Sequence, residues 1–251
     1  MPRSLVSFAA LAALAATAAT PPNFHKDVLP ILQQRCQQCH RPGEISPMSL
    51  ITYAGTRPWA KSIREAVITR KMPPWFADPK YGHFANDRSL SQTEIETLVA
   101  WVDAGTPAGD PKDAPSPRTW PQGWTIGTPD AVFEMTAPFP IPAKGSIDYQ
   151  YIILPTHFSG DKWIQKVEVR PSDPRVVHHA VVYIREPASK WLQGQPDRRA
   201  FSVPLSKGFT TSDILMVYTP GNSFDLWKSG MAKKIKAGSD LVLQMHYTAN
   251  G

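Results

Sequence analysis

The chain has 251 residues, of which 42% are hydrophobic, and its 27 Lys and Arg residues against 21 Asp and Glu residues leave a formal net charge of +6. This length suits one or two domains, and the hydrophobic share is enough to build their cores. The basic residues are spread along the chain, and we expect the densest cluster, at residues 233–236, to be the solvated end of a strand or turn. The charge pattern therefore argues against nucleic acid as a partner.

The first residues have the pattern of an export signal. Arg3 precedes an alanine-rich apolar run over residues 5–15, and Ala16-Thr17-Ala18 fits an A-x-A cleavage site. The run is shorter than the about 20 residues of a membrane-spanning helix, although an uncleaved N-terminal anchor is the alternative. We expect residues 1–18 to be a signal peptide and the mature chain to be periplasmic or secreted, with no stable membrane insertion.

Five consecutive residues carry the most specific chemistry in the sequence. Cys36-Gln37-Gln38-Cys39-His40 read C-x-x-C-H and contain the only two cysteines of the chain. This is the attachment motif of c-type haem, in which two thiols on a helical turn reach the haem vinyl groups and the histidine binds iron. A disulfide or part of a zinc site is the alternative, but the motif supplies three zinc ligands at most. The sequence predicts covalent haem c at Cys36 and Cys39, with His40 on the iron.

Three segments before residue 106 have helical periodicity. The first begins near Asn23 and runs into the cysteine motif, and the third opens with Ser91-Gln92-Thr93-Glu94, which resembles a capping box, and stops at Gly105. The expected buried faces are Val28, Leu29 and Leu32; Trp59, Ile63, Ala66 and Val67; and Ile95, Leu98, Val99 and Val102. We therefore expect a small all-α domain wrapped around a haem at residues 22–106.

A haem iron in such a domain needs a second axial ligand. Met72 follows the second helix and precedes two prolines that hold the chain extended, so its thioether would be presented rigidly. Met48 and His83 are the alternatives, but Met48 lies only eight positions after His40. We predict Met72 as the ligand; a core methionine beside the haem is the structural alternative.

These residues resemble a class of small bacterial cytochromes c. The resemblance covers roughly residues 22–106 and rests on three matching pieces: the C-x-x-C-H motif with Arg41-Pro42-Gly43 after it, Met72-Pro73-Pro74-Trp75, and Leu98-Val99-Ala100-Trp101-Val102-Asp103-Ala104-Gly105. The first piece is specific for haem c, and the other two strengthen the match. It implies an electron-transfer function for this part of the chain.

A change of pattern follows this region. Residues 107–121 contain five prolines and few large apolar residues, which predicts a stiff, extended linker. Beyond it, short runs rich in β-branched and aromatic residues alternate with turn signals, at residues 149–154, 163–169, 176–184, 214–218 and 241–247. We expect residues 122–251 to form an antiparallel, jelly-roll-like β-sandwich, so that the fold class is multidomain, all-α and then all-β.

Two of the expected strands carry histidines. His178 and His179 are adjacent on one strand, and His246 lies on another. Imidazoles on neighbouring strands are good ligands for copper or zinc. Adjacent residues of a regular strand point to opposite faces, however, so the first two histidines reach one metal only if that strand twists or bulges. The structural alternative is one buried, hydrogen-bonded histidine and one exposed histidine.

The β region resembles the ascorbate-dependent type II copper monooxygenases, the family of peptidylglycine α-hydroxylating monooxygenase and dopamine β-monooxygenase. The matching segments are Val177-His178-His179-Ala180 and Leu243-Gln244-Met245-His246-Tyr247. The resemblance implies that His178, His179 and His246 bind one copper ion that passes electrons. It is incomplete, because the sequence has no H-x-H pair for the second, oxygen-reacting copper and no cysteines for the disulfides of the animal enzymes. We expect the chain to be a C-terminally truncated fragment.

Three functions remain open on this sequence. The first is an exported haem and copper electron-transfer protein, part of a copper-dependent monooxygenase whose partners are a redox protein or a small reductant. The second is an electron-transfer cytochrome c fused to a non-catalytic β-sandwich binding module. The third is a metal-sensing or metal-carrying module. Whether the chain itself is an enzyme is not decided by the sequence.

Overall fold

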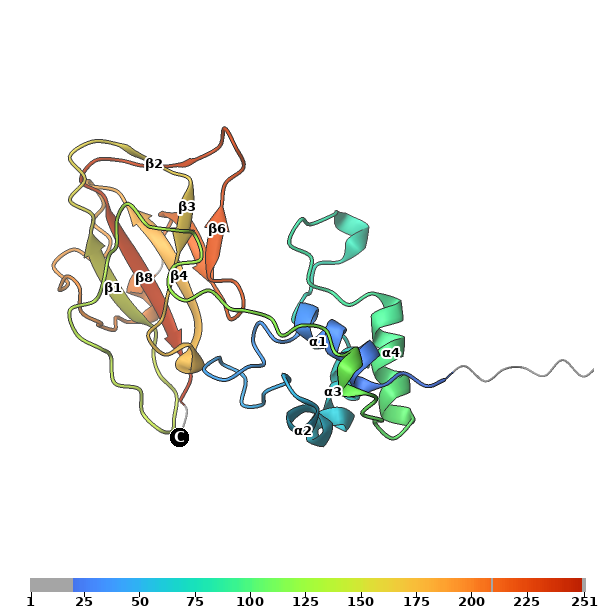
Figure 1. Cartoon of the computed structure of the whole chain (residues 1–251). Helices are drawn as coiled ribbons and strands as arrows, with labels where there is room; N and C mark the ends of the chain where they lie inside the picture. The colour runs from blue at the N-terminus through green and yellow to red at the C-terminus, as the bar shows by residue number, and fades with distance from the viewer. Residues whose placement is uncertain (1–19, 209, 250–251) are drawn as a thin grey trace, which may run out of the picture.

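The computed structural model describes residues 20–208 and 210–249, so the predicted signal peptide at residues 1–18 lies outside the described residues. The chain forms a helical region followed by a larger region of antiparallel strands (Figure 1). No helix in the described part of the chain is long and apolar enough to cross a membrane.

The helical region contains short helices. A π-helical turn at Phe24–Val28 leads into α1 at Leu29–Arg35, α2 covers Tyr53–Thr56, and the 3₁₀ turn Arg57–Trp59 leads into α3 at Ala60–Ile68. The 3₁₀ turn Pro79–Tyr81 precedes α4 at Gln92–Asp103, and another 3₁₀ turn follows at Pro111–Asp113. The side chain of Asn23 caps the first turn, and Ser91 and Glu94 form the predicted capping box.

The prediction of a small all-α cytochrome domain is wrong. The four helices of this region have 7, 4, 9 and 12 residues, and long irregular segments separate them. Prolines and glycines at residues 42–47 and 73–82 interrupt the backbone bonding that longer helices need, and most ordered structure elsewhere is antiparallel sheet. The periodicity located the helices correctly but overstated how much of the region they form.

The core of the helical region follows the predicted faces with one exception. Val28, Leu32 and Leu98 are buried together with Trp101, which makes one apolar cluster under the helices. Trp59, predicted on the buried face of the second helix, is 39% exposed. It lies in the 3₁₀ turn before α3, where the side-chain direction differs from that of the helix.

The β region is built around one sheet. β1 (Gln150–Pro155), β8 (Asp240–Tyr247), β4 (Val177–Arg185) and β5 (Asp213–Tyr218) pair in that order, all antiparallel. β2 (Lys162–Ile164) pairs with β7 (Lys233–Ile235), and β3 (Lys166–Glu168) pairs with β6 (Phe224–Leu226). A 3₁₀ turn at Pro174–Val176 precedes β4, and the short α5 at Leu205–Gly208 precedes β5. The described strands thus form one four-stranded sheet and two ribbons, whereas a regular jelly-roll sandwich was expected.

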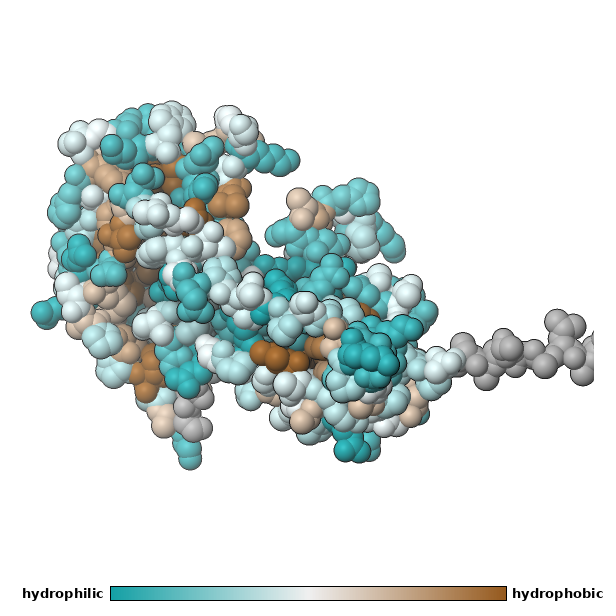
Figure 2. Space-filling view, in the orientation of Figure 1, coloured by the Kyte–Doolittle hydropathy of each residue, from teal (hydrophilic) through white to brown (hydrophobic). Residues whose placement is uncertain are grey.

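The main sheet has an apolar cluster on each face. One cluster includes Ala180, Met216 and Met245, and the other includes Tyr151 and Val242. Since alternate residues of a strand face opposite sides, β4, β8 and β1 contribute to both clusters. Figure 2 shows a mostly hydrophilic outer surface in which apolar patches are separate on the face in view.

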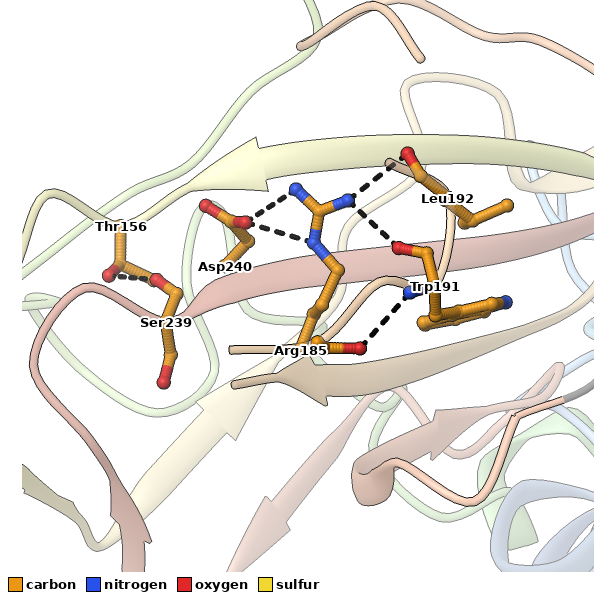
Figure 3. Close-up of polar contacts among 7 residues, drawn as sticks. Thr156, Arg185, Trp191, Leu192, Ser239 and Asp240 are labelled. Carbon is orange, nitrogen blue, oxygen red and sulfur yellow. Dashed lines mark hydrogen bonds and ion pairs between the residues drawn. The ribbon is translucent and has the colours of Figure 1, made fainter. Parts of the chain in front are cut away.

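Charged side chains hold the end of the sheet where β4 stops and β8 starts. Arg185 donates to Asp240 at 2.6 and 3.0 Å and to the carbonyl oxygens of Trp191 and Leu192 at 3.2 and 3.3 Å (Figure 3). The nearby basic cluster is also paired: Lys233 with Asp213, Lys234 with Asp161, and Lys236 with Glu186. The charges of this basic cluster are therefore neutralised within the fold. The strand or turn expected at residues 233–236 is β7 and the residue after it.

The proline-rich segment packs against the helical region. The carbonyl oxygen of Pro107 accepts from Phe24 N at 2.9 Å and from Trp101 Nε1 at 3.0 Å. Further along, Gln33 donates to the Ser116 carbonyl, and Arg118 donates to the Gln33 carbonyl. These contacts tie the predicted linker to α1 and α4.

Candidate functional site

The cysteine motif, residues 36–40, continues the last turn of α1. The backbone N–H of Cys36 donates to Leu32 at 2.9 Å, and those of Cys39 and His40 donate to the Cys36 carbonyl at 3.1 and 3.0 Å. The turn therefore carries both thiols and the imidazole, as the spacing predicts. Both cysteines are free and half-buried.

His40 is held in one orientation by a neighbouring hydroxyl. Ser46 Oγ lies 2.7 Å from His40 Nδ1, and the same hydroxyl contacts the sulfur of Met48 at 3.2 Å. Burial lowers the pKa of His40, and a backbone hydrogen bond at Met48 opposes this shift. The imidazole is therefore neutral at pH 7, and its Nε2 is the nitrogen left for a metal.

Arg41 fixes the loop that follows. Its guanidinium donates to the carbonyl oxygens of Gln37 and Gln38, pairs with Glu44 at 2.5 Å, and stacks 3.8 Å from the ring of Trp120. A guanidinium with several partners loses little freedom per bond, so it is an effective brace. The brace ties the cysteine motif to the end of the proline-rich segment.

The two thiols are neutral in this environment. Burial, followed by the nearby Cys39 and Glu94, raises the pKa of Cys36 to about 12, and burial raises that of Cys39 as well. Reactive or catalytic cysteines have lowered pKa values. Within residues 20–208 and 210–249, moreover, the only group of three or more potential metal ligands is elsewhere in the fold. The free cysteines disfavour the disulfide alternative, and the place of the metal-ligand group disfavours the zinc alternative.

The structure separates the two methionine candidates. Met48 contacts the hydroxyl that binds Nδ1 of His40, and it packs on the helical core. Met72 is 45% exposed on the loop that projects between α3 and α4 (Figure 1), and no hydrogen bond among the described residues joins it to His40. Met72 as iron ligand stays a prediction.

The residues of the motif fit a covalent haem. Two free thiols share one turn, and the adjacent imidazole is neutral with Nδ1 already engaged.

The histidine cluster, His178, His179 and His246, forms where β4 and β8 pair. Val177 pairs with Tyr247 and His179 pairs with His246, with a register shift between Val177 and His179. Three residues of β4 thus oppose two of β8, which is a β-bulge with His178 as the extra residue. The distortion that convergence requires is therefore present, and all three imidazoles meet.

The geometry of the cluster suits one metal ion. One nitrogen of each ring lies within 4.8 Å of the others, and Nδ1 of His178 is 3.1 Å from Nδ1 of His179. Three nitrogens around one ion at about 2.0–2.1 Å are roughly 3–4 Å apart, so small side-chain movements complete the site. Nδ1 of His246 is buried and has no hydrogen-bond partner among the described residues.

The surroundings of the cluster lower the pKa values of two of its histidines, which favours cation binding. Burial, then His246 and His178, lowers the pKa of His179, and burial, then His178, lowers the pKa of His246. Both rings are therefore neutral at pH 7, which is the state that binds metal. His178 is exposed, so the site is open to solvent on that side. Imidazole ligands suit copper and zinc alike.

Tyr149 is a neighbour that the sequence analysis missed. Its ring centroid lies 4.9 Å from that of His246 and 5.9 Å from that of His179. Tyr149 precedes β1, and period-2 alternation places it on the same face as Tyr151. The pairing of Gln150 with Met245 brings it beside His246. Only knowledge of that register would have found it.

Comparison of the chain with protein-family models, with curated proteins and with solved structures gave no match. The function is therefore argued from the two groups of residues alone.

Proposed function

We propose that this chain is an exported redox protein that holds a covalent haem c at Cys36 and Cys39 and one copper ion at His178, His179 and His246. The observation that carries the proposal is the convergence of the three imidazoles at the bulge, with an unpartnered buried nitrogen on His246. Electron transfer is the function, and it serves copper-dependent hydroxylation of a substrate.

The helical region supplies the first site. With haem bound, Cys36 and Cys39 would form the thioethers, Nε2 of His40 would bind the iron, and Ser46 would hold the imidazole through Nδ1. Met72 would be the second iron ligand. When bound, haem supplies reversible one-electron chemistry, and a thioether ligand raises its reduction potential.

The β region supplies the second site. Its three imidazoles hold the ion, and the ring of Tyr149 lies against His179 and His246 while the His178 side faces solvent. A copper ion bound there supplies one-electron chemistry and keeps a position for solvent or a small molecule. The net charge of +6 favours encounter with acidic redox partners, and a small reductant is the other source of electrons.

The test of the haem site is a haem stain after denaturing electrophoresis of protein made with the c-type maturation machinery. The wild type should stain, and the Cys36→Ala, Cys39→Ala double variant should not. Haem that is extracted from the wild type by acidified acetone is not covalently bound, and that result would contradict the assignment.

The test of the copper site is titration of the full chain with cupric ion, followed by electron paramagnetic resonance. We expect one type II signal with nitrogen splitting. Stoichiometric binding that survives removal of all three histidines would place the metal elsewhere. A folded chain that stains for haem and binds no copper would favour the cytochrome with a non-catalytic β module.

A further inference from the structure

The turn between β5 and β6 lies directly against the cysteine motif. Thr219 and Asn222 exchange backbone hydrogen bonds of 3.2 and 2.7 Å across the turn, and Gly221 between them has φ +80°. A Cβ on Gly221 would lie 3.0 Å from Cys39 Sγ and 2.8 Å from Nη1 of Arg88. The backbone of the β region therefore approaches the helical region as closely as a side chain permits.

Two separate requirements select glycine at this position. The left-handed backbone is one, since other residues adopt it at a cost in free energy. The close approach is the other, because a Cβ 3.0 Å from Cys39 Sγ is tighter than nine in ten real Cβ contacts and would force this region to give by a few tenths of an ångström. Gly230 in the same region also has φ +80° but nothing within 4 Å of its ideal Cβ. A comparison of Gly221 with Gly230 therefore separates the effect of the left-handed backbone from the effect of the close contact.

The same turn is joined to the histidine cluster by strand pairing. Tyr218 ends β5, is only 4% exposed, and pairs with Ala180, which directly follows His179 on β4. Paired Cα atoms are about 4.5–5.5 Å apart and consecutive ones 3.8 Å, so the backbones of Tyr218 and His179 are at most about 9 Å apart.

The electrostatics of Tyr218 show its closeness to the first site. Burial, followed by the nearby Glu44 and Cys39, raises the pKa of this phenol to about 12. Tyr218 and Gly221 thus both lie beside the loop that carries Cys39. The route from Cys39 to His179 therefore runs through the contact with Gly221, the backbone from Gly221 to Tyr218, the pairing of Tyr218 with Ala180, and the peptide bond from Ala180 to His179.

We infer that the β5–β6 turn, residues 218–222, is a docking element that seats the β region on the cysteine motif and so fixes the separation of the two sites. The inference rests on the proposed function for its purpose, because a redox protein needs its two groups at a constant distance. Gly221 acts as a positioning residue: it carries no ligand of either proposed group, and its missing Cβ leaves room for the contact with Cys39 Sγ. Arg88, half-buried on the helical side, covers the other side of the contact.

The first test needs neither haem nor copper. Hydrogen exchange is measured in the full chain for Gly221→Val and for the matched control Gly230→Val. Loss of docking should make exchange about tenfold faster both in residues 219–222 and in residues 36–44, and the control should leave both segments unchanged. Faster exchange in the turn alone would show backbone strain without docking and would overturn the inference.

The second test uses the loaded protein. The dipolar interaction between oxidised haem and cupric ion should give one narrow distance distribution in the wild type and in Gly230→Val, and a broad one in Gly221→Val. A broad distribution in the wild type would overturn the fixed separation. A chain that shows docking by exchange but lacks haem or copper would overturn the proposed function instead, and with it the purpose assigned to the turn.

Discussion

The cysteine motif is built from residues that are close in the sequence, whereas the histidine cluster is built from residues that are far apart in it. Cys36, Cys39 and His40 lie on one turn of backbone that closes with bonds to Leu32 and Cys36. In the cluster, by contrast, His246 is brought beside His178 and His179 by the pairing of β4 with β8. The cysteine motif needs only a local helical turn, whereas the histidine cluster needs the register of two strands.

This difference makes the two sites vulnerable to different changes. A local site keeps its geometry while the turn survives, even if packing elsewhere is weakened. A site that depends on register is lost when two strands slip by one residue, because every side chain then changes face. The bulge at His178 anchors the register at this end of the pair, and Arg185 with Asp240 anchors the other end.

The largest expected effect is on copper affinity. His246→Ala removes one of three ligands, so the dissociation constant for cupric ion should rise by more than about 100-fold, since loss of even an outer-shell partner costs 10–100-fold. Competition titration measures it. His157→Asn, an exposed histidine of the same region that lies outside the cluster, is the control and should bind as the wild type does. Equal losses in both variants would break the assignment.

The second prediction concerns the axial ligand of the iron. Met72→Ala should remove the weak absorption band near the red end of the oxidised spectrum and lower the reduction potential, because a thioether ligand is lost. Met48→Ala should leave both nearly intact, since Met48 lies on the Ser46 side of His40. Redox titration followed by absorbance distinguishes them. Loss of the band in Met48→Ala alone would reverse the assignment.

The third prediction tests how far the copper site depends on the distant end of the strand pair. Arg185→Ala leaves Asp240 and two carbonyl groups unpaired, so unfolding of the β region should become easier by about 2–3 kcal/mol. Urea unfolding measures it. Arg175→Ala breaks an exposed pair with Asp173 and should leave the urea midpoint close to the wild-type value.

Copper affinity of the same Arg185→Ala variant sharpens the comparison. If the bulge holds the register locally, the dissociation constant stays within about threefold of the wild-type value, a free-energy change under about 0.7 kcal/mol. A tenfold weaker site would mean that the register is set along the whole strand pair.

The smallest expected effect is in the helical region. Glu94→Ala removes half of the capping box and the partner of Arg35, so α4 should lose about 1 kcal/mol. Glu94→Gln is the control that keeps the capping hydrogen bond without the charge. Helical circular dichroism during thermal unfolding is the measurement, and haem staining should be unaffected in both variants. Loss of staining would show that the cysteine turn depends on distant packing.

The stabilisation of the fold by the Glu94 carboxylate should decrease as the pH falls. Burial by itself raises the pKa of Glu94, but hydrogen bonds from Ser91 and Arg35 outweigh it and hold the pKa below its usual value. A carboxyl with a lowered pKa stabilises the fold above its unfolded pKa of about 4.3 and loses this contribution as the pH falls through the folded value. The difference between wild type and Glu94→Gln should therefore be present at pH 7 and shrink below about pH 4.

The sequence by itself determined the features that depend on neighbours along the chain. The C-x-x-C-H spacing placed two thiols and an imidazole on one turn, and Asn23, Ser91 and Glu94 marked the starts of helices that the structure contains. The five expected strands were also located, although residues 163–169 split into β2 and β3, because β propensity and alternation act over a few residues.

Tertiary structure alone decided the rest. The short strands β6 and β7, the packing of the proline-rich segment, the exposure of Trp59 and the small helical content of the first region follow from distant contacts that no local pattern contains. His178 and His179 should face opposite sides by local rules, and only the register shift against β8 brings both to His246. The contact of Gly221 with Cys39 joins positions 182 residues apart, and only the folded chain brings these two together.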